Sequence, residues 1–253
     1  MERVAVKGYV VGAFLRSLLI HSTWNFQRMQ NMGFAYAMMP TIRHLARDVD
    51  ERSRMLKRHL QLFNTHPCMS GPIIGSAMRL EENRGRDGEC TDVDHLKTTL
   101  MAPYAAMGDT LFSGSLKPLA GLAGVLLALN GFLSASLVLL LLYNPLHGWI
   151  RLRGFVEGYK KGKEGVDFIR SLNIPRVSKM IRWLSVVLLG LLAAVVSAQS
   201  IVPVSGGTAI LGKGFFLAVL LICWWMVKKG VPMTSILYGA SLMVIALGWV
   251  WTS

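Results

Sequence analysis

A run of 25 residues without one charged side chain, 119–143, constrains what this chain can fold into more than any other feature. A helix of that length can cross the hydrocarbon core of a bilayer. Three more apolar runs follow, at 183–201, 215–227 and 233–252. The run 215–227 is short and would be tilted or incomplete, whereas the last run ends in tryptophans of the kind that anchor a helix at a membrane interface. The sequence therefore predicts an all-α membrane protein.

Charged residues are distributed unevenly along the chain. Lysine and arginine number 27 against 14 aspartate and glutamate residues, a net charge of +13, and all of the acids precede residue 168. Beside the apolar runs, this asymmetry favours a membrane surface with anionic lipid as the partner. Nucleic acid is not expected, because the basic residues are not interleaved with aromatic ones on one face and no base-reading motif occurs.

The basic residues also predict an orientation. The loop 144–182 carries nine lysines and arginines and should be cytoplasmic by the positive-inside rule. The N-terminal region is basic as well and should lie on the same side, while the C-terminus should lie outside. A single crossing at 119–143 cannot join two cytoplasmic segments. Either 119–150 is a hairpin, or the Pro- and Gly-interrupted stretch 100–116 also enters the membrane as a re-entrant or broken segment.

We expect two regions in the chain. Residues 1–95 are predicted to form amphipathic helices, because apolar and charged side chains alternate along them. These helices should be cytoplasmic or interfacial, because no stretch is apolar enough to span a bilayer. A polar loop with glycines at 83–95 marks the boundary. Residues 96–253 would form the membrane-embedded helical core.

Three hydrogen-bonding side chains, Asn64, Thr65 and His66, lie at a forced chain break. The apolar stripe before them is expected to be helical and to be stopped by Pro67, because the residue before a proline is pushed out of the α region. Amide groups of this kind bind adjacent sugar hydroxyls. The alternative interpretation is that Asn64 and Thr65 only satisfy free carbonyls at a helix end.

Acidic and aromatic side chains elsewhere would complete a sugar site. Glu81 with Asn64 would hold hydroxyls and Trp24 would stack on the ring. Glu81 and Glu82 are adjacent and so point to different faces of a helix, which favours a solvated helix end for at least one of them. Trp24 and Arg28 are four residues apart, and the alternative for this pair is an interfacial Trp beside a snorkelling Arg on one helix face.

Asp109 is the only carboxylate between Asp94 and Glu157, within an apolar and glycine-rich segment. An ionised group is costly in such a setting unless it is paired, so an acid there indicates a functional site. The competing interpretation is that Asp109 caps the N-terminus of the helix that follows, since aspartate is a preferred cap. The sequence leaves both interpretations open.

Several kinds of site are not expected. The six histidines show no HxxxH or HxH spacing and the three cysteines no metal-ligand spacing, so neither a metal site nor a disulfide framework is predicted. No GxSxG, Cys-His or Rossmann pattern occurs, and residues 158–164 fail the spacing of a phosphate loop. We expect no catalytic residue, no metal and no cofactor.

Four strings occur in a fixed order over the first half of the chain. They are SxWNFQRMQNMGFAYAMMP at 22–40, KRHLQLFNTHP at 57–67, the acidic pair at 81–82 and MGDTLFSGSLKP at 107–118. Together they resemble the IID subunit of the mannose/fructose/sorbose family of phosphoenolpyruvate-dependent sugar phosphotransferase systems, a far more specific signal than a lone short motif. The resemblance covers most of the chain and fades after about residue 165, where only hydrophobicity matches.

The resemblance implies a non-catalytic subunit of a bacterial inner membrane. Such a subunit would pair with a IIC subunit, in a homo-oligomer of IIC–IID pairs, to form the sugar translocation path. It would present a hexose to phosphorylated IIB, while the phosphorylated histidines belong to the soluble IIA and IIB components. In the family the string around Asp109 keeps the acid in place. Two alternatives stay open, a stand-alone homo-oligomeric transporter of small molecules and a regulatory or degenerate IID-like membrane scaffold.

Overall fold

The computed structural model describes residues 8–83, 91–198, 207–232 and 234–242. The chain divides into two compact units, Met1–Leu192 and Ala193–Ser253. Apart from two isolated bridges, the regular structure of the described residues is helical. The candidate site lies in the first unit.

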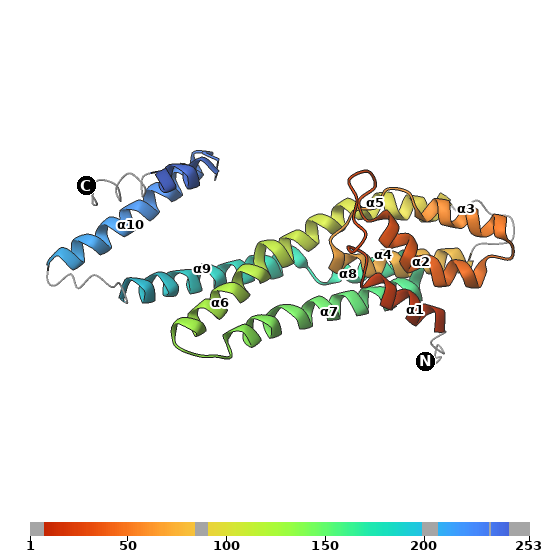
Figure 1. Ribbon diagram of the computed structural model, residues 1–253, viewed down its shortest axis with the longest axis horizontal. Coiled ribbons are helices and arrows are strands. Elements are labelled where there is room, and N and C mark those ends of the chain that lie inside the picture. The colour runs from red at the N-terminus through yellow and green to blue at the C-terminus, as the bar shows by residue number, and fades with distance from the viewer. Residues whose placement is uncertain (1–7, 84–90, 199–206, 233, 243–253) are drawn as a thin grey trace. The chain divides into compact units, whose positions relative to one another are not determined.

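Figure 1 labels the helices. In chain order they are α1 (Gly8–Ser17), α2 (Asn31–Leu45), α3 (Val49–His59), the 3-10 turn η1 (Pro67–Met69), α4 (Ser70–Asn83), α5 (Thr91–Gly108), the π-helical η2 (Asp109–Leu116), α6 (Lys117–Leu129), α7 (Ala135–Lys161), η3 (Gly162–Val166), α8 (Asp167–Ser171), α9 (Ile174–Ala198) and α10 (Gly207–Lys228).

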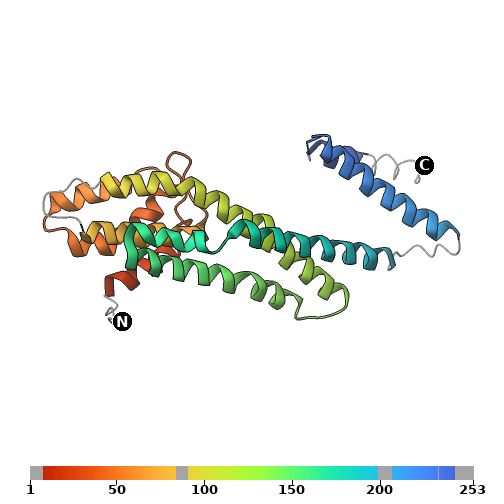
Figure 2. The same cartoon turned by 180° about the vertical axis from the view of Figure 1, so that it is seen from behind.

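Helix α4 forms the centre of the first unit and is buried on all sides from Ser70 to Met78. It lies along α7, as both views show (Figures 1 and 2). The two backbones touch, because a Cβ atom added at Gly71 or Gly75 would overlap the backbone carbonyl of Arg151 or Phe155. Small residues permit such close approach of two helices. The first turns of α4, which follow directly on η1, are therefore fixed against α7.

The apolar run 119–143 is not one helix. Helices α5, η2 and α6 continue one another from residue 91 to residue 129, and a turn at 130–134 then leads into the antiparallel α7 (Figure 1). Asn130 closes α6 through its side-chain amide, which donates to the Leu126 carbonyl at 2.8 Å, and Gly131 adopts a left-handed φ of 79°. The run 119–143 is thus divided by a turn into α6 and the start of α7, while 100–116 belongs to the same continuous helix as α6. Which of these segments enter the membrane stays a prediction.

Two described helices are long and apolar enough to cross a membrane, Asp92–Leu129 and Ile174–Val196. The predicted run 183–201 falls within α9 as far as Ala198, and its last residues lie outside the described ones. The run 215–227 falls within α10, which begins earlier, at Gly207. Of the run 233–252, residues 234–242 are helical and the rest lies outside the described part. The division of the chain at residue 95 stays a prediction.

Candidate functional site

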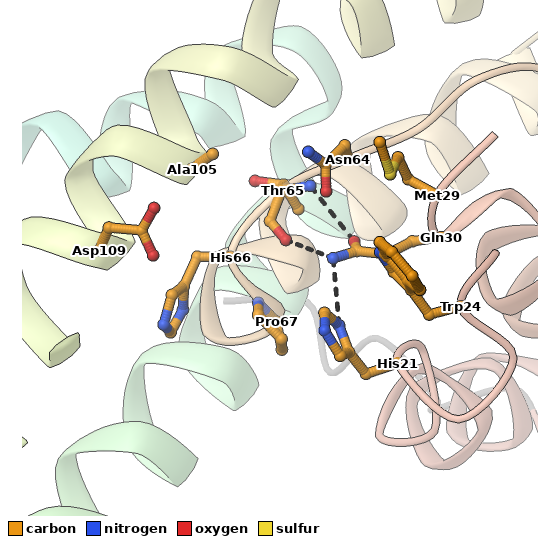
Figure 3. Close-up of a pocket in the computed structure, with 10 residues that line it drawn as sticks. All are labelled: His21, Trp24, Met29, Gln30, Asn64, Thr65, His66, Pro67, Ala105 and Asp109. Carbon is orange, nitrogen blue, oxygen red and sulfur yellow. Dashed lines mark hydrogen bonds between the residues drawn. The ribbon is translucent and has the colours of Figure 1, made fainter. Parts of the chain in front are cut away.

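A cavity of about 500 Å³ opens between three parts of the chain that are distant in sequence (Figure 3). They are the loop after α1, the segment between α3 and η1, and the junction of α5 with η2. The residues around the cavity are His21, Trp24, Met29, Gln30, Asn64, Thr65, His66, Pro67, Ala105 and Asp109. The structure therefore brings together five of the six residues predicted for a sugar site, and Glu81 is not among them.

The segment before Pro67 is extended and not helical, which corrects the expectation of a helix reaching Asn64. Helix α3 ends at His59. Beyond it, the backbone N–H of Gln30 donates to the Phe63 carbonyl at 2.8 Å, and Met29 and Phe63 form an isolated parallel bridge. Pairing with the loop after α1 replaces the helical hydrogen bonds, and the buried ring of Phe63 packs on Phe34 with centroids 4.5 Å apart.

Asn64 and Thr65 do not serve as caps of α3. The Leu60 carbonyl at its end accepts from Nδ2 of Asn31 at 2.9 Å and from Nη1 of Arg28 at 3.3 Å. Thr65 is buried and its hydroxyl has no hydrogen-bond partner among the described residues, while Asn64 is exposed at the cavity. The hydroxyls of Thr41, Ser76 and Ser178 are in the same state away from the cavity, so it is the place of Thr65 beside the cavity that makes its hydroxyl a candidate ligand contact.

Gln30 holds the backbone of Thr65 from the opposite side. Its Nε2 donates to the Thr65 carbonyl at 2.6 Å and its Oε1 accepts from the Thr65 N–H at 3.3 Å (Figure 3). Gln30 is only 1% exposed. Sequence reasoning missed Gln30 and His21 as site residues, although Gln30 lies within one of the strings that carry the family resemblance.

His66 is a neutral side chain fixed by its neighbours. Its Nδ1 accepts from the backbone N–H of Cys68 at 3.3 Å, and its ring stacks on Phe112 with centroids 5.2 Å apart. Gly108 is required opposite, because a Cβ atom there would overlap the imidazole. Burial lowers the pKa of His66 to about 4, although the nearby Asp109 carboxylate opposes the shift. Through the hydrogen bond from Cys68, His66 also caps the start of η1.

Asp109 is not an N-cap, so that alternative is wrong. The preceding residue, Gly108, is itself helical with φ −63° and ψ −46°, and the chain continues as a π-helix without a break. The hydroxyl of Ser115 donates to the Thr110 carbonyl at 2.7 Å, five residues back. Single π-helical segments within α-helices are frequent at functional sites. The carboxylate of Asp109 is exposed at the cavity on the side of His66 (Figure 3).

Trp24 lies in a loop and not on a helix face with Arg28. The side chain is 41% exposed, borders the cavity and meets the ring of Phe26 edge-on at 4.8 Å. The guanidinium of Arg28 is bound to the Leu60 carbonyl, so the interpretation of the pair as interfacial Trp and snorkelling Arg fails. An indole face at a cavity offers a stacking surface to the CH groups of a sugar ring.

Glu81 lies in a separate buried cluster. It is 4% exposed, accepts from Nε and Nη2 of Arg58 at 3.0 Å each, and lies 3.0 Å from Nε2 of His59. Burial lowers the pKa of His59 despite the carboxylate, so Arg58 is the cation that pairs with Glu81. Glu82 is bound by Tyr9, Tyr159 and Arg79. Neither acid forms a solvated helix end, which corrects that expectation.

The chemistry available in the cavity is hydrogen bonding and stacking. An amide, a hydroxyl, a carboxylate, a neutral imidazole and an indole line the cavity, a set that suits a neutral polyhydroxylated ring. Among the residues described by the structure, no group of three or more His, Cys, Asp or Glu side chains lies close enough to hold a metal ion.

Comparison with known proteins agrees with this chemistry. A family model of the phosphotransferase mannose/fructose/sorbose family IID component matches residues 6–252. The mannose-specific EIID component of Escherichia coli K12 is 31% identical over 268 residues, which cover 97% of this chain and 94% of the relative. The fructose permease IID component of Bacillus subtilis is 30% identical, over 98% of this chain and 97% of the relative.

Two solved structures share the fold, each 28% identical and covering 97% of both chains. One is described as a membrane protein and has a TM-score of 0.76, and the other is the mannose transporter ManYZ in complex with microcin E492, with a TM-score of 0.60. These matches confirm the prediction of an all-α membrane protein. The chain therefore belongs to the IID component family of the mannose/fructose/sorbose phosphotransferase systems, whose members are non-catalytic membrane subunits.

Proposed function

We propose that this chain pairs with a IIC subunit to form the translocation path of a hexose and presents the sugar to phosphorylated IIB. The observation that carries the proposal is the cavity, where Asn64, Thr65 and Asp109 meet from distant parts of the chain beside Trp24. The relatives are named for mannose, fructose and sorbose, which are neutral hexoses. The phosphoryl group would pass from IIA to IIB and then to the sugar.

Each side chain has a role that follows from its chemistry. The carboxylate of Asp109 and the amide of Asn64 bind adjacent hydroxyls, since each can engage two groups at once. The free hydroxyl of Thr65 adds a third contact, and Trp24 stacks on the apolar face of the ring. His66, neutral at physiological pH, separates the two halves of the site. Glu81 stabilises the fold nearby and does not touch the sugar.

The chain would lie in the bacterial inner membrane with its N-terminus in the cytoplasm and its C-terminus outside. The hairpin of α6 and α7 supports this orientation, because it returns the chain to the side from which it entered. The basic residues of 144–182 would then face anionic lipid at the cytoplasmic surface. IIC–IID pairs would assemble further into a homo-oligomer.

The test is sugar uptake in cells that carry the complete system with one altered IID chain. We expect Asn64→Ala and Asp109→Asn each to abolish most of the uptake while the chain still co-purifies with IIC in mild detergent. His95→Asn, an exposed side chain on α5 away from the cavity, is the matched control and should behave as wild type. Unchanged uptake in both Asn64→Ala and Asp109→Asn would overturn the site. Recovery of the chain alone, without IIC, would overturn the pairing.

A further inference from the structure

The orientation of the Gln30 side-chain amide is determined by its surroundings. One backbone residue, Thr65, offers it both an acceptor and a donor, and the amide meets the carbonyl with Nε2 at 2.6 Å and the N–H with Oε1 at 3.3 Å. A flipped amide would place Nε2 against the N–H and Oε1 against the carbonyl, so both hydrogen bonds would be lost. The side chain is buried, which favours keeping both hydrogen bonds.

This orientation fixes the tautomer of His21. Nε2 of Gln30 also lies 3.2 Å from Nδ1 of His21 (Figure 3). An amide nitrogen has two hydrogens and no acceptor capacity, so Nδ1 must accept. The proton of a neutral imidazole must then be on Nε2, because the hydrogen bond made by one ring nitrogen decides the state of the other.

We infer that His21, oriented by Gln30, is a specificity-determining residue that presents an Nε2–H donor to the cavity. His21 borders the cavity, and no second hydrogen bond to its ring is found among the described residues. Asp109, which only accepts when ionised, lies on the other side of His66 (Figure 3). The inference rests on the proposed function and adds the direction of the hydrogen bonds at the two ends of the cavity. One ligand hydroxyl would accept from His21, and other ligand hydroxyls would donate to Asp109.

Gln30 is a positioning residue in this scheme, because it acts on the ligand only through His21 and Thr65. Glutamate at position 30 would keep the length of the side chain but would have acceptors alone when ionised. It could not donate to the Thr65 carbonyl, and Nδ1 of His21 would have to become a donor. The substitution Gln30→Glu therefore moves the proton of His21 without removing the histidine.

The tautomer is measurable without any sugar. We would record the ¹⁵N resonances of histidine-labelled IID in the purified IIC–IID complex and assign His21 by its loss in His21→Asn. Wild type is expected to show a protonated Nε2 with an unprotonated Nδ1, and Gln30→Glu is expected to show a protonated Nδ1. A protonated Nδ1 in wild type, or identical signals in the two proteins, would overturn the inference.

Two substitutions at position 21 separate the donor from mere packing. The amide nitrogen of glutamine reaches the position of Nε2 of histidine, whereas the shorter asparagine reaches only the position of Nδ1. We expect His21→Gln to bind radiolabelled mannose or fructose within about threefold of wild type and His21→Asn to bind it about tenfold more weakly, the size of one neutral hydrogen bond. His95→Asn controls for the loss of a histidine elsewhere.

The outcomes distinguish this inference from the proposed function. If Asn64→Ala and Asp109→Asn weaken binding while His21→Asn binds as wild type does, the role of His21 is overturned and the cavity stands. If none of the three substitutions changes binding, the proposed function of the cavity fails with it. Equal losses in His21→Gln and His21→Asn would show that the ring only packs, which also overturns the inference.

Discussion

The cavity and the cluster around Glu81 contain similar polar side chains, yet Glu81 is buried in an ion pair, whereas Asp109 and Asn64 are exposed at the cavity. Pairing in the cluster is incomplete, because Nδ1 of His59 has no hydrogen-bond partner among the described residues. At Glu81 both carboxylate oxygens are met by Arg58, and His59 adds a ring nitrogen. At the cavity the hydroxyl of Thr65 has no partner, and no side-chain hydrogen bond is found for Asn64 within the described residues. Because buried charges are normally paired, the first arrangement is a structural joint, while the exposed groups of the second are available to a ligand.

The largest effect on stability is expected for the substitution Glu81→Ala. Removing the carboxylate leaves the partly buried guanidinium of Arg58 without its partner, and we expect a loss of up to about 3–5 kcal/mol in the free energy of unfolding. Thermal unfolding of the purified complex measures it. The matched control is Glu157→Ala, since Glu157 pairs with the largely exposed Lys161 and Arg153 and should cost less than about 1 kcal/mol. Equal losses of unfolding free energy in the two variants would mean that the Glu81 cluster contributes no more to stability than a surface ion pair.

For Asp109→Asn we expect a large loss of sugar binding and little change in stability. Asp109→Asn removes a charged acceptor for ligand hydroxyls, so the sugar should bind about 10–100-fold more weakly, the equivalent of about 1.5–3 kcal/mol. The free energy of unfolding should stay within about 0.5 kcal/mol of wild type, because an exposed side chain is exchanged. Calorimetric titration and thermal unfolding of one preparation give both values. A destabilised protein with intact binding would place Asp109 among the structural acids.

Acidification should destabilise the protein through His66, and His59 beside Glu81, whose pKa burial also lowers, adds to the loss in the same direction. Burial holds the pKa of His66 at about 4, below the ordinary value of 6.5, while Asp109 opposes the shift and His147, His21 and Arg151 add to it. The unfolded chain thus binds more protons, and stability falls as the pH drops from 6.5 towards 4.

The control for this pH effect is the protein without the imidazole. His66→Asn, which keeps an acceptor for the Cys68 N–H, should lose less unfolding temperature than wild type between pH 7 and pH 5. His95→Asn should follow wild type. Parallel curves for wild type and His66→Asn would mean that His66 is not buried in the assembled protein.

The smallest effect is expected for Thr65→Val. Valine has a similar shape and removes a hydroxyl that has no partner, so the free energy of unfolding should be unchanged or higher by a few tenths of a kcal/mol. Sugar binding should weaken by about two- to tenfold, since one neutral hydrogen bond is lost. Thr41→Val provides the comparison, because its buried hydroxyl also lacks a partner but lies away from the cavity. It should leave binding unchanged.

Much of the helical structure could be predicted from the periodicity of apolar residues, but the residues at which helices end could not. The helix that was expected to reach Asn64 stops at His59, because Gln30 and Asn31 bind the following segment from 29 or more residues away in sequence. Local propensity contains no term for such a partner. The dipeptide Asn130-Gly131, by contrast, is a typical turn sequence. It was overlooked because it lies among leucines in an uncharged run.

The site was predictable in part. Asn64, Thr65, His66, Asp109 and Trp24 were identified from residue type and family strings, and the fold brings them to one cavity. Glu81 was misplaced, since a sequence does not show that Arg58, one helix earlier, lies opposite it. His21 and Gln30 were missed because their roles depend on a backbone contact with Thr65.

The glycine contact between α4 and α7 has a mechanical consequence. The residues 64–69 lead straight into α4, whose backbone lies against that of α7 without side chains between them. A single rigid unit is therefore formed by the Asn64 side of the cavity, α4 and α7. Asp109 belongs to the other limb of the hairpin, within the π-helical η2. His66 ties this limb to the same unit, because it packs against Gly108 and stacks on Phe112. A side chain added at Gly71 or Gly75 should therefore disturb both sides of the cavity, although neither glycine borders it.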